Sequence, residues 1–161
     1  MSGRTAPDGA AAEVEAIKLV KARYCRFLDT KDGAAWRALF ADDLVVELDM
    51  APATGGADPM TAPPVVGADR FVSSVLATLD GAATVHHVHT PEIDLTSETT
   101  ATGVWAMADR LVYPGGRSLF GAGHYHETYE KIDDEWKIKT QHLTRLWVEM
   151  AGDWSGAIPS S

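Results

Sequence analysis

The chain has 161 residues, of which 45% are hydrophobic, a size and composition typical of one globular domain with a sizeable core. Its 23 acidic residues outnumber its 14 basic ones and give a net charge of -9, without any cluster of lysine and arginine. This balance disfavours nucleic acid and anionic membranes as partners, and no apolar run approaches the ~18 residues of a membrane span.

Residues 1–12 are rich in alanine, glycine and proline and are expected to form a flexible N-terminus. They contain no cationic start leading into an apolar region, so we expect an unexported, cytoplasmic protein. Residues 13–29 are predicted to form a helix, because apolar residues recur there with the 3.6-residue period of a helix lying on a core. These residues are Val14, Ile17, Val20, Tyr24, Phe27 and Leu28. The single cysteine, Cys25, excludes an internal disulfide and is expected to be a buried thiol.

Two further helices and one strand are predicted before the middle of the chain. Asp32-Gly33 ends the first helix, and a second, shorter helix is predicted at residues 34–40. A strand is predicted at residues 44–49. Residues 50–66 contain four prolines and two adjacent glycines, too many for a core element, and are expected to form a mobile loop or lid. A third helix is predicted at residues 68–79.

The rest of the chain is predicted to consist mainly of strands. They are residues 83–95, 99–113, 118–132 and 135–150, with turn sequences at Pro114-Gly115-Gly116 and Asp133-Asp134. Helices first and long antiparallel strands second indicate an α+β fold, in which one curved sheet wraps around the helices and offers a concave face. We expect one domain, residues 13–150, followed by a loose tail at residues 151–161.

Residues 84–90 read Thr-Val-His-His-Val-His-Thr and hold three of the chain's six histidines inside a predicted strand. Side chains alternate between the two faces of a strand, so His86 shares a face with Val88. His87 and His89 share the other face. A histidine aimed into a pocket can act as a general base or acid near neutral pH. On these residues alone, a histidine in a strand is more often a packed side chain than a catalyst, so the packed interpretation is favoured.

The order of the predicted elements and several short motifs resemble one known family. The motifs are Tyr24-x4-Asp29, His86 seven residues before Ile93, Gly103-Val-Trp-Ala-Met-Ala-Asp109, and Gly123-His-Tyr-His-Glu-Thr-Tyr129 before Asp133-Asp-Glu-Trp136. Over residues 13–149 the chain resembles the SnoaL-like branch of the NTF2-like superfamily, in particular the scytalone dehydratase, bile acid 7α-dehydratase and hexachlorocyclohexane dehydrochlorinase group. The resemblance implies a cone-shaped barrel of one strongly curved, mostly antiparallel sheet around about three helices. It leaves the reaction open, because this barrel hosts dehydratases, isomerases, cyclases and plain binding proteins.

The resemblance also implies a catalytic dyad of Asp29 and His86, assisted by Tyr24. A histidine that removes a proton works best when its far ring nitrogen is hydrogen-bonded to a carboxylate, which fixes the tautomer and stabilises the imidazolium. A phenol can then donate to an enolate oxygen or to a departing hydroxyl. Residues five apart on an ideal helix point ~140° apart, so Tyr24 and Asp29 converge only if the helix tightens or ends near Asp29.

We expect a largely apolar pocket, with substrate-binding side chains at Trp105, Met107, Tyr125, Val88, Phe27 and Leu48. Tyr125 is the best match to a polar residue that contacts ligand in the scytalone enzymes. Trp105 and Met107 are explained equally well as ordinary core. Asp109 shares their face and is expected near the pocket rim or paired with Arg110. The arginine that assists in several relatives has only two approximate counterparts, Lys131 and Arg145.

A metal site is the competing interpretation. The pairs His87-x-His89 and His124-x-His126 have strand-compatible spacing. His142 lies on another predicted strand and is the one further histidine expected to accompany His86 in the cavity. If His86 faces the cavity, both pairs face the outer surface of the sheet, where this superfamily commonly forms dimers. We therefore expect no metal and no organic cofactor.

These observations predict a small-molecule lyase that forms a homodimer or a higher homo-oligomer. The favoured reaction is dehydration of a hydrophobic, polycyclic, steroid, terpenoid or polyketide-like substrate. The alternatives are an isomerase or cyclase that uses the same pocket, and a non-catalytic module for ligand binding or assembly.

Overall fold

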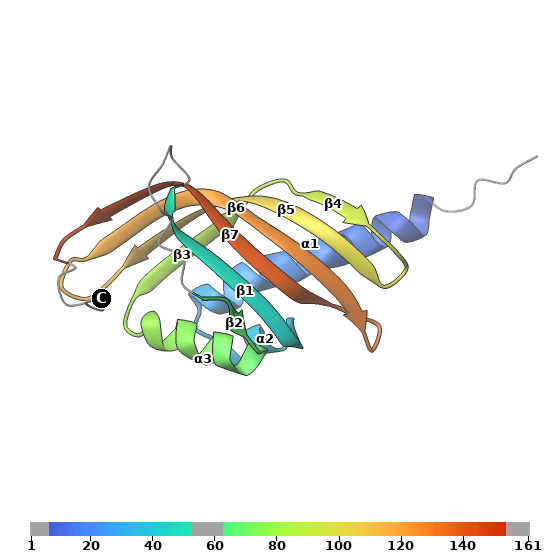
Figure 1. Cartoon of the computed structure of the whole chain (residues 1–161), viewed down its shortest axis with the longest axis horizontal. Helices are drawn as coiled ribbons and strands as arrows, with labels where there is room; N and C mark the ends of the chain where they lie inside the picture. Colours follow the sequence, from blue (N-terminus) through green and yellow to red (C-terminus); the bar gives the residue numbers. More distant parts are fainter. Residues whose placement is uncertain (1–6, 53–62, 154–161) are drawn as a thin grey trace, which may run out of the picture.

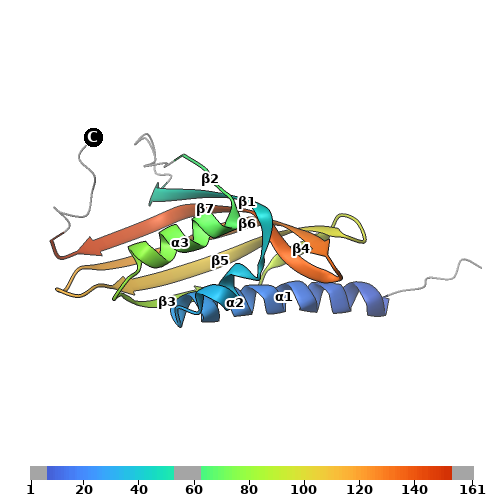
Figure 2. The same ribbon diagram turned by 90° about the horizontal axis from the view of Figure 1, so that it is seen from below.

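The computed structural model describes residues 7–52 and 63–153, which form one curled sheet with three helices on its concave side (Figure 1). The elements are α1 (Pro7–Asp29), α2 (Gly33–Arg37), β1 (Phe40–Pro52), β2 (Val65–Val66), α3 (Ala68–Thr78), β3 (Ala83–Val88), β4 (Glu92–Leu95), β5 (Thr100–Val112), β6 (Ser118–Ile132) and β7 (Glu135–Ala151). Figure 2 shows α1 running along the length of the sheet with α2 beside it. The predicted α+β class is confirmed.

The described strands form a single sheet in the order β2-β1-β7-β6-β5-β3, and β4 pairs with the first part of β5. β1 and β7 run parallel, whereas the other neighbouring strands are antiparallel. The sheet is strongly curled but does not close on itself, because β2 and β3 stand at opposite ends of this order. The expected cone-shaped architecture is therefore present with an open side.

Most predicted boundaries agree with the structure, and the differences have local causes. α1 begins at Pro7, before the predicted start at residue 13, and proline suits a first helical turn because its missing N–H needs no partner there. Phe40 belongs to β1 rather than to the second helix. The strand predicted at residues 83–95 is divided into β3 and β4 near Pro91, which cannot donate to a strand ladder.

Much of the predicted lid at residues 50–66 lies outside the described residues, as does most of the predicted tail. Residues 50–52 continue β1, and Val65 and Val66 form β2, which pairs with β1. None of the helices in the described ranges is long and apolar enough to cross a membrane.

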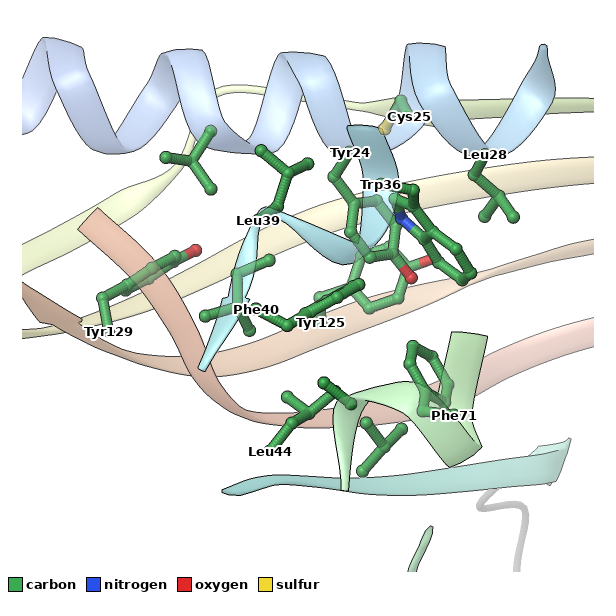
Figure 3. Close-up of a cluster of buried hydrophobic side chains, with 14 of the residues drawn as sticks. Tyr24, Cys25, Leu28, Trp36, Leu39, Phe40, Leu44, Phe71, Tyr125 and Tyr129 are labelled. Carbon is green, nitrogen blue, oxygen red and sulfur yellow. The ribbon is translucent and has the colours of Figure 1, made fainter. Parts of the chain in front are cut away.

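An aromatic cluster fills the space between the helices and the sheet (Figure 3). The ring centroid of the fully buried Trp36 lies 5.4 Å from those of Tyr24, Phe40 and Phe71. Tyr24 also stands edge-on to Tyr125 of β6, with 5.8 Å between the ring centroids. Such contacts add about 0.5–1.5 kcal/mol each beyond the burial of area. The cluster fixes the C-terminal half of α1 against the inner face of the sheet.

Candidate functional site

His86 is directed to the concave side of the sheet by the alternation of side chains along β3. Its side chain is 7% exposed, whereas His87 and His89 are exposed on the opposite face. β3 packs against α1, which brings Asp29, the last residue of that helix, beside the imidazole. The neighbouring strand places Asp109 directly opposite His86 in the ladder.

Asp29 binds His86 through both carboxylate oxygens. Oδ1 of Asp29 lies 2.6 Å from Nδ1 of His86, and Oδ2 accepts the backbone N–H of His86 at 2.8 Å. The hydroxyl of Thr84 donates to Oδ1 at 2.9 Å. Burial acts to raise the pKa of Asp29, but the hydrogen bonds from His86 and Thr84 outweigh it and leave the pKa lowered. Asp29 is therefore a carboxylate near neutral pH, and it favours the tautomer of His86 that carries its proton on Nδ1.

A second carboxylate, that of Asp109, lies near the other nitrogen of the imidazole. Its Oδ2 is 3.9 Å from Nε2 of His86. Arg145 of β7 donates to Asp109 with two N–H groups, at 2.6 Å and 2.8 Å, in a bidentate pair. Both side chains are 3% exposed, and Nε of Arg145 is buried without a hydrogen-bond partner among the described residues.

The expectation that Asp109 lies near the pocket rim or pairs with Arg110 is wrong. Arg110 is exposed on the opposite face, and Asp109 is buried in its pair with Arg145. An aspartate at a buried strand position needs a cation as partner, so Asp109 on an apolar strand face is a sequence signal for such a pair. The sequence does not identify the cation, because that depends on which distant strands pair. Gly121 makes room for the side chain of Arg145, because a Cβ there would clash with the guanidinium.

Tyr24 belongs to a separate buried network. Its hydroxyl donates to Oε1 of Gln141 at 3.1 Å, and Nε2 of Gln141 donates to Glu127 at 2.6 Å. Glu127 also binds the ammonium of Lys21 and the hydroxyl of Tyr129. The side chains of Lys21 and Glu127 are fully buried. Burial, reinforced by the charge of Glu127, raises the pKa of Tyr24 far above its ordinary value, so its hydroxyl keeps its proton.

The structure therefore brings Asp29 and His86 together and leaves Tyr24 in a different network. No hydrogen bond in the described part of the chain joins Tyr24 to either member of the dyad, and α1 remains helical to Asp29. Tyr125 of β6 packs against the Tyr24 network. Its ring lies 3.6 Å from Nζ of Lys21, and burial, reinforced by the charge of Asp109, raises its pKa.

The residues predicted to bind substrate are of three kinds: side chains buried in the core, side chains half-buried against it, and Phe27, which lies in a separate hollow. Trp105 is buried and donates its indole N–H to Tyr129 at 2.8 Å, and Sδ of Met107 lies 3.8 Å from the guanidinium of Arg145. Two others, Val88 and Leu48, are half-buried against the core, and Tyr125 is buried. Phe27 lines a surface hollow of about 570 Å³ between α1, α2 and the β6–β7 turn, and the lining of this hollow does not include the dyad.

Five histidines lie on the outer face of the sheet. The rings of His124 and His126 are 6.2 Å apart, as are those of His126 and His142. His142 pairs with His126 across the ladder and contacts Asp49 at 3.0 Å, so the expectation that it accompanies His86 in the cavity is wrong. No group of three or more His, Cys, Asp or Glu residues within residues 7–52 and 63–153 is arranged to hold a metal ion.

Comparisons with known proteins agree with this fold. A candidate scytalone dehydratase from Novosphingobium aromaticivorans superposes with a TM-score of 0.74 at 24% identity, covering 92% of this chain and 93% of that one. A hexachlorocyclohexane dehydrochlorinase, LinA-type3 of Novosphingobium barchaimii, superposes with a TM-score of 0.68 at 16% identity, covering 91% and 93%.

A candidate cyclase of Gibberella zeae, FGR4, is 26% identical over 137 residues, which cover 81% of this chain and 89% of that protein. The family model for the SnoaL-like domain matches residues 9–142, which is most of the chain. The protein therefore belongs to the SnoaL-like domain family, as its motifs predict.

Proposed function

We propose that the protein is a small-molecule lyase that eliminates water from a hydrophobic substrate, with His86 as the base. The observation that carries this proposal is the imidazole of His86, held at Nδ1 by the carboxylate of Asp29. Membership of the SnoaL-like family supports a lyase or cyclase activity. The relatives named as a candidate cyclase, a candidate scytalone dehydratase and a dehydrochlorinase support it as well.

In the proposed reaction, Nε2 of His86 accepts a proton from the carbon next to a carbonyl group. The electron pair of that C–H bond forms the new C=C bond as the C–O bond to the leaving hydroxyl breaks. The imidazolium then returns the proton to the departing hydroxyl, which leaves as water. Asp29 stabilises the imidazolium between the two transfers, and the atoms and electrons balance without a co-reactant.

The carbonyl oxygen gains negative charge as the proton is removed, so it needs a hydrogen-bond donor. We assign this role first to Arg145, because its Nε is a buried donor without a partner. Tyr24, the residue that the resemblance suggests, donates to Gln141 and serves here only after that bond breaks. Trp105, Met107 and other inner side chains would form the apolar wall that selects a polycyclic, steroid, terpenoid or polyketide-like substrate.

Cyclisation is the second candidate, because a relative that matches 81% of the chain is named as a candidate cyclase. The same base would remove a proton from carbon, and the resulting carbanion would attack a second carbonyl within the substrate. The two reactions share their first step and differ in whether a C–O bond breaks or a C–C bond forms.

We also propose that the protein is a homodimer, or a higher homo-oligomer, joined through the outer face of the sheet. Phe120 and Trp147 stand there edge-on, with ring centroids 4.9 Å apart, and each is 42% exposed. Leu146 beside them is 64% exposed. Exposed apolar side chains grouped on one face favour association.

A product assay tests the proposed function. Purified protein is incubated with a panel of polycyclic and polyketide-like β-hydroxy ketones, and the products are examined by mass spectrometry. We expect loss of water with the wild type and none with His86→Gln. Compounds that bind equally well to both proteins and are never converted would identify a binding module and refute the lyase.

A further inference from the structure

A chain of hydrogen bonds joins Lys31 to the carboxylate that holds His86. Nζ of Lys31 donates to Oγ1 of Thr84 at 2.8 Å, and Thr84 donates to Oδ1 of Asp29 at 2.9 Å. An ammonium group has no lone pair, so the hydroxyl proton of Thr84 points to Asp29. Thr84 is 7% exposed, which limits competition from water. Asp29 thus receives a donor that is itself bound to a cation.

The backbone of Lys31 adopts a conformation that favours glycine. Its φ angle is 59°. The N–H groups of Lys31 and Asp32 donate to the carbonyls of Leu28 and Phe27, the pattern of a helix C-cap whose left-handed residue is commonly glycine. A lysine here costs stability relative to glycine, so the turn alone does not explain its presence.

Each carboxylate beside His86 has a cation of its own. Asp109 is paired with Arg145, and Asp29 is connected through Thr84 to Lys31. Two carboxylates without cations would favour the imidazolium form of His86, which cannot accept a proton. The cations oppose this effect.

Two further titratable groups near the site, Cys25 and Tyr125, carry no charge that would replace either cation. Cys25 of α1 lies close enough to Asp29 to interact with its charge, and burial raises the pKa of this thiol to about 11. Tyr125 of β6 interacts with Asp109 and Arg145, and burial raises its pKa as well. Both side chains are therefore neutral near neutral pH.

We propose that Lys31, acting through the hydroxyl of Thr84, is a positioning residue that offsets the charge of Asp29 and keeps the His86 imidazole neutral and able to accept a proton. The inference rests on the proposed role of His86 as the base. Its test uses no substrate, so failure of the lyase proposal and failure of this one are distinguishable.

The test follows the titration of the His86 ring by NMR in protein labelled at histidine, with the resonance assigned from the His86→Gln spectrum. Lys31→Gly and Lys31→Met should move the midpoint to higher pH by about half a pH unit, the effect of removing one partly screened cation. Thr84→Val should move it in the same direction. Lys31→Arg should leave it near the wild-type value, and so should Lys18→Met, which removes an exposed cation on α1.

Lys31→Gly separates this role from a structural one. Glycine relieves the left-handed backbone, so this variant should melt at a higher temperature than the wild type while its His86 midpoint still moves. A wild-type midpoint in both Lys31→Gly and Lys31→Met would overturn the proposal. An equal displacement in Lys31→Arg would overturn it too, because the charge would then not be the cause.

Discussion

The imidazole of His86 lies between two carboxylates whose environments differ. Asp29 contacts it directly at Nδ1 and is half-buried, whereas Asp109 is 3.9 Å from Nε2 and engaged by Arg145. The first carboxylate therefore orients the ring. The second lies on the side from which a proton would arrive, and it can stabilise the imidazolium without competing directly for the proton.

Asp29→Asn should destabilise the protein in a pH-dependent manner. The pKa of Asp29 is lowered in the folded state. Its contribution to stability is therefore complete above the pKa of the unfolded state, about 3.9, and is lost as the pH falls through the pKa of the folded state. The difference in unfolding free energy between Asp29→Asn and the wild type should be large near neutral pH and shrink as the pH falls below about 3.9. Urea unfolding at several pH values measures it, with the exposed Asp94→Asn as control. A difference that does not change with pH would contradict this account.

Between elements, a buried polar network links α1 to β6 and β7 through Lys21, Glu127 and Gln141. Lys21 lies on the buried side of α1 with Ile17 and Tyr24. A lysine on an apolar helical stripe indicates a buried carboxylate partner, and the sequence contains this signal. The partner is 106 positions away in the chain, so only the strand pairing identifies it.

Lys21→Met should cost about 3–5 kcal/mol of stability, because it leaves the charge of Glu127 buried without its cation. The double variant Lys21→Met/Glu127→Leu should be more stable than Lys21→Met alone, since the unpaired charge is then removed. Lys18→Met, at an exposed pair with Glu15, should change stability by less than about 0.5 kcal/mol. Denaturant unfolding measures all three. A double variant less stable than the single one would show that the ion pair is not the cause.

Local sequence patterns predicted the elements better than their pairings. The period of apolar residues gave the bounds of β6 at residues 118–132, and those of α3 to within one residue. The division of β3 from β4 follows from Pro91, whose effect on a ladder the alternation pattern does not register. The parallel pairing of β1 with β7 joins segments far apart in the sequence and leaves no local signal.

Across the whole molecule, the helices cover the concave face of the sheet (Figures 1 and 2). The outer face carries exposed apolar side chains, among them Phe120 and Trp147. The family resemblance predicted this architecture and the two members of the dyad. It did not identify the pair of Asp109 and Arg145, because their contact depends on the curl of the sheet and on the space left by Gly121.

Trp147→Arg should convert the proposed dimer to a monomer, because it places a charge at the centre of the exposed apolar group on the outer face. Leu19→Arg is the matched control, since Leu19 is 47% exposed on α1, away from the sheet's outer face. Sedimentation velocity distinguishes the states. A wild-type protein that is monomeric at tens of micromolar, or dissociation by Leu19→Arg instead, would contradict the proposed interface.

Exchange of a substrate's C–H proton with solvent tests whether His86 removes a proton from carbon. A ketone substrate analogue without a leaving group is incubated in D2O, and deuterium incorporation next to the carbonyl is followed by NMR. The wild type and His87→Gln, which alters the exposed neighbour on the opposite face, should exchange at the same rate. His86→Gln should lose about 10²- to 10⁴-fold of the catalysed rate. Exchange by His86→Gln at the wild-type rate would contradict the account.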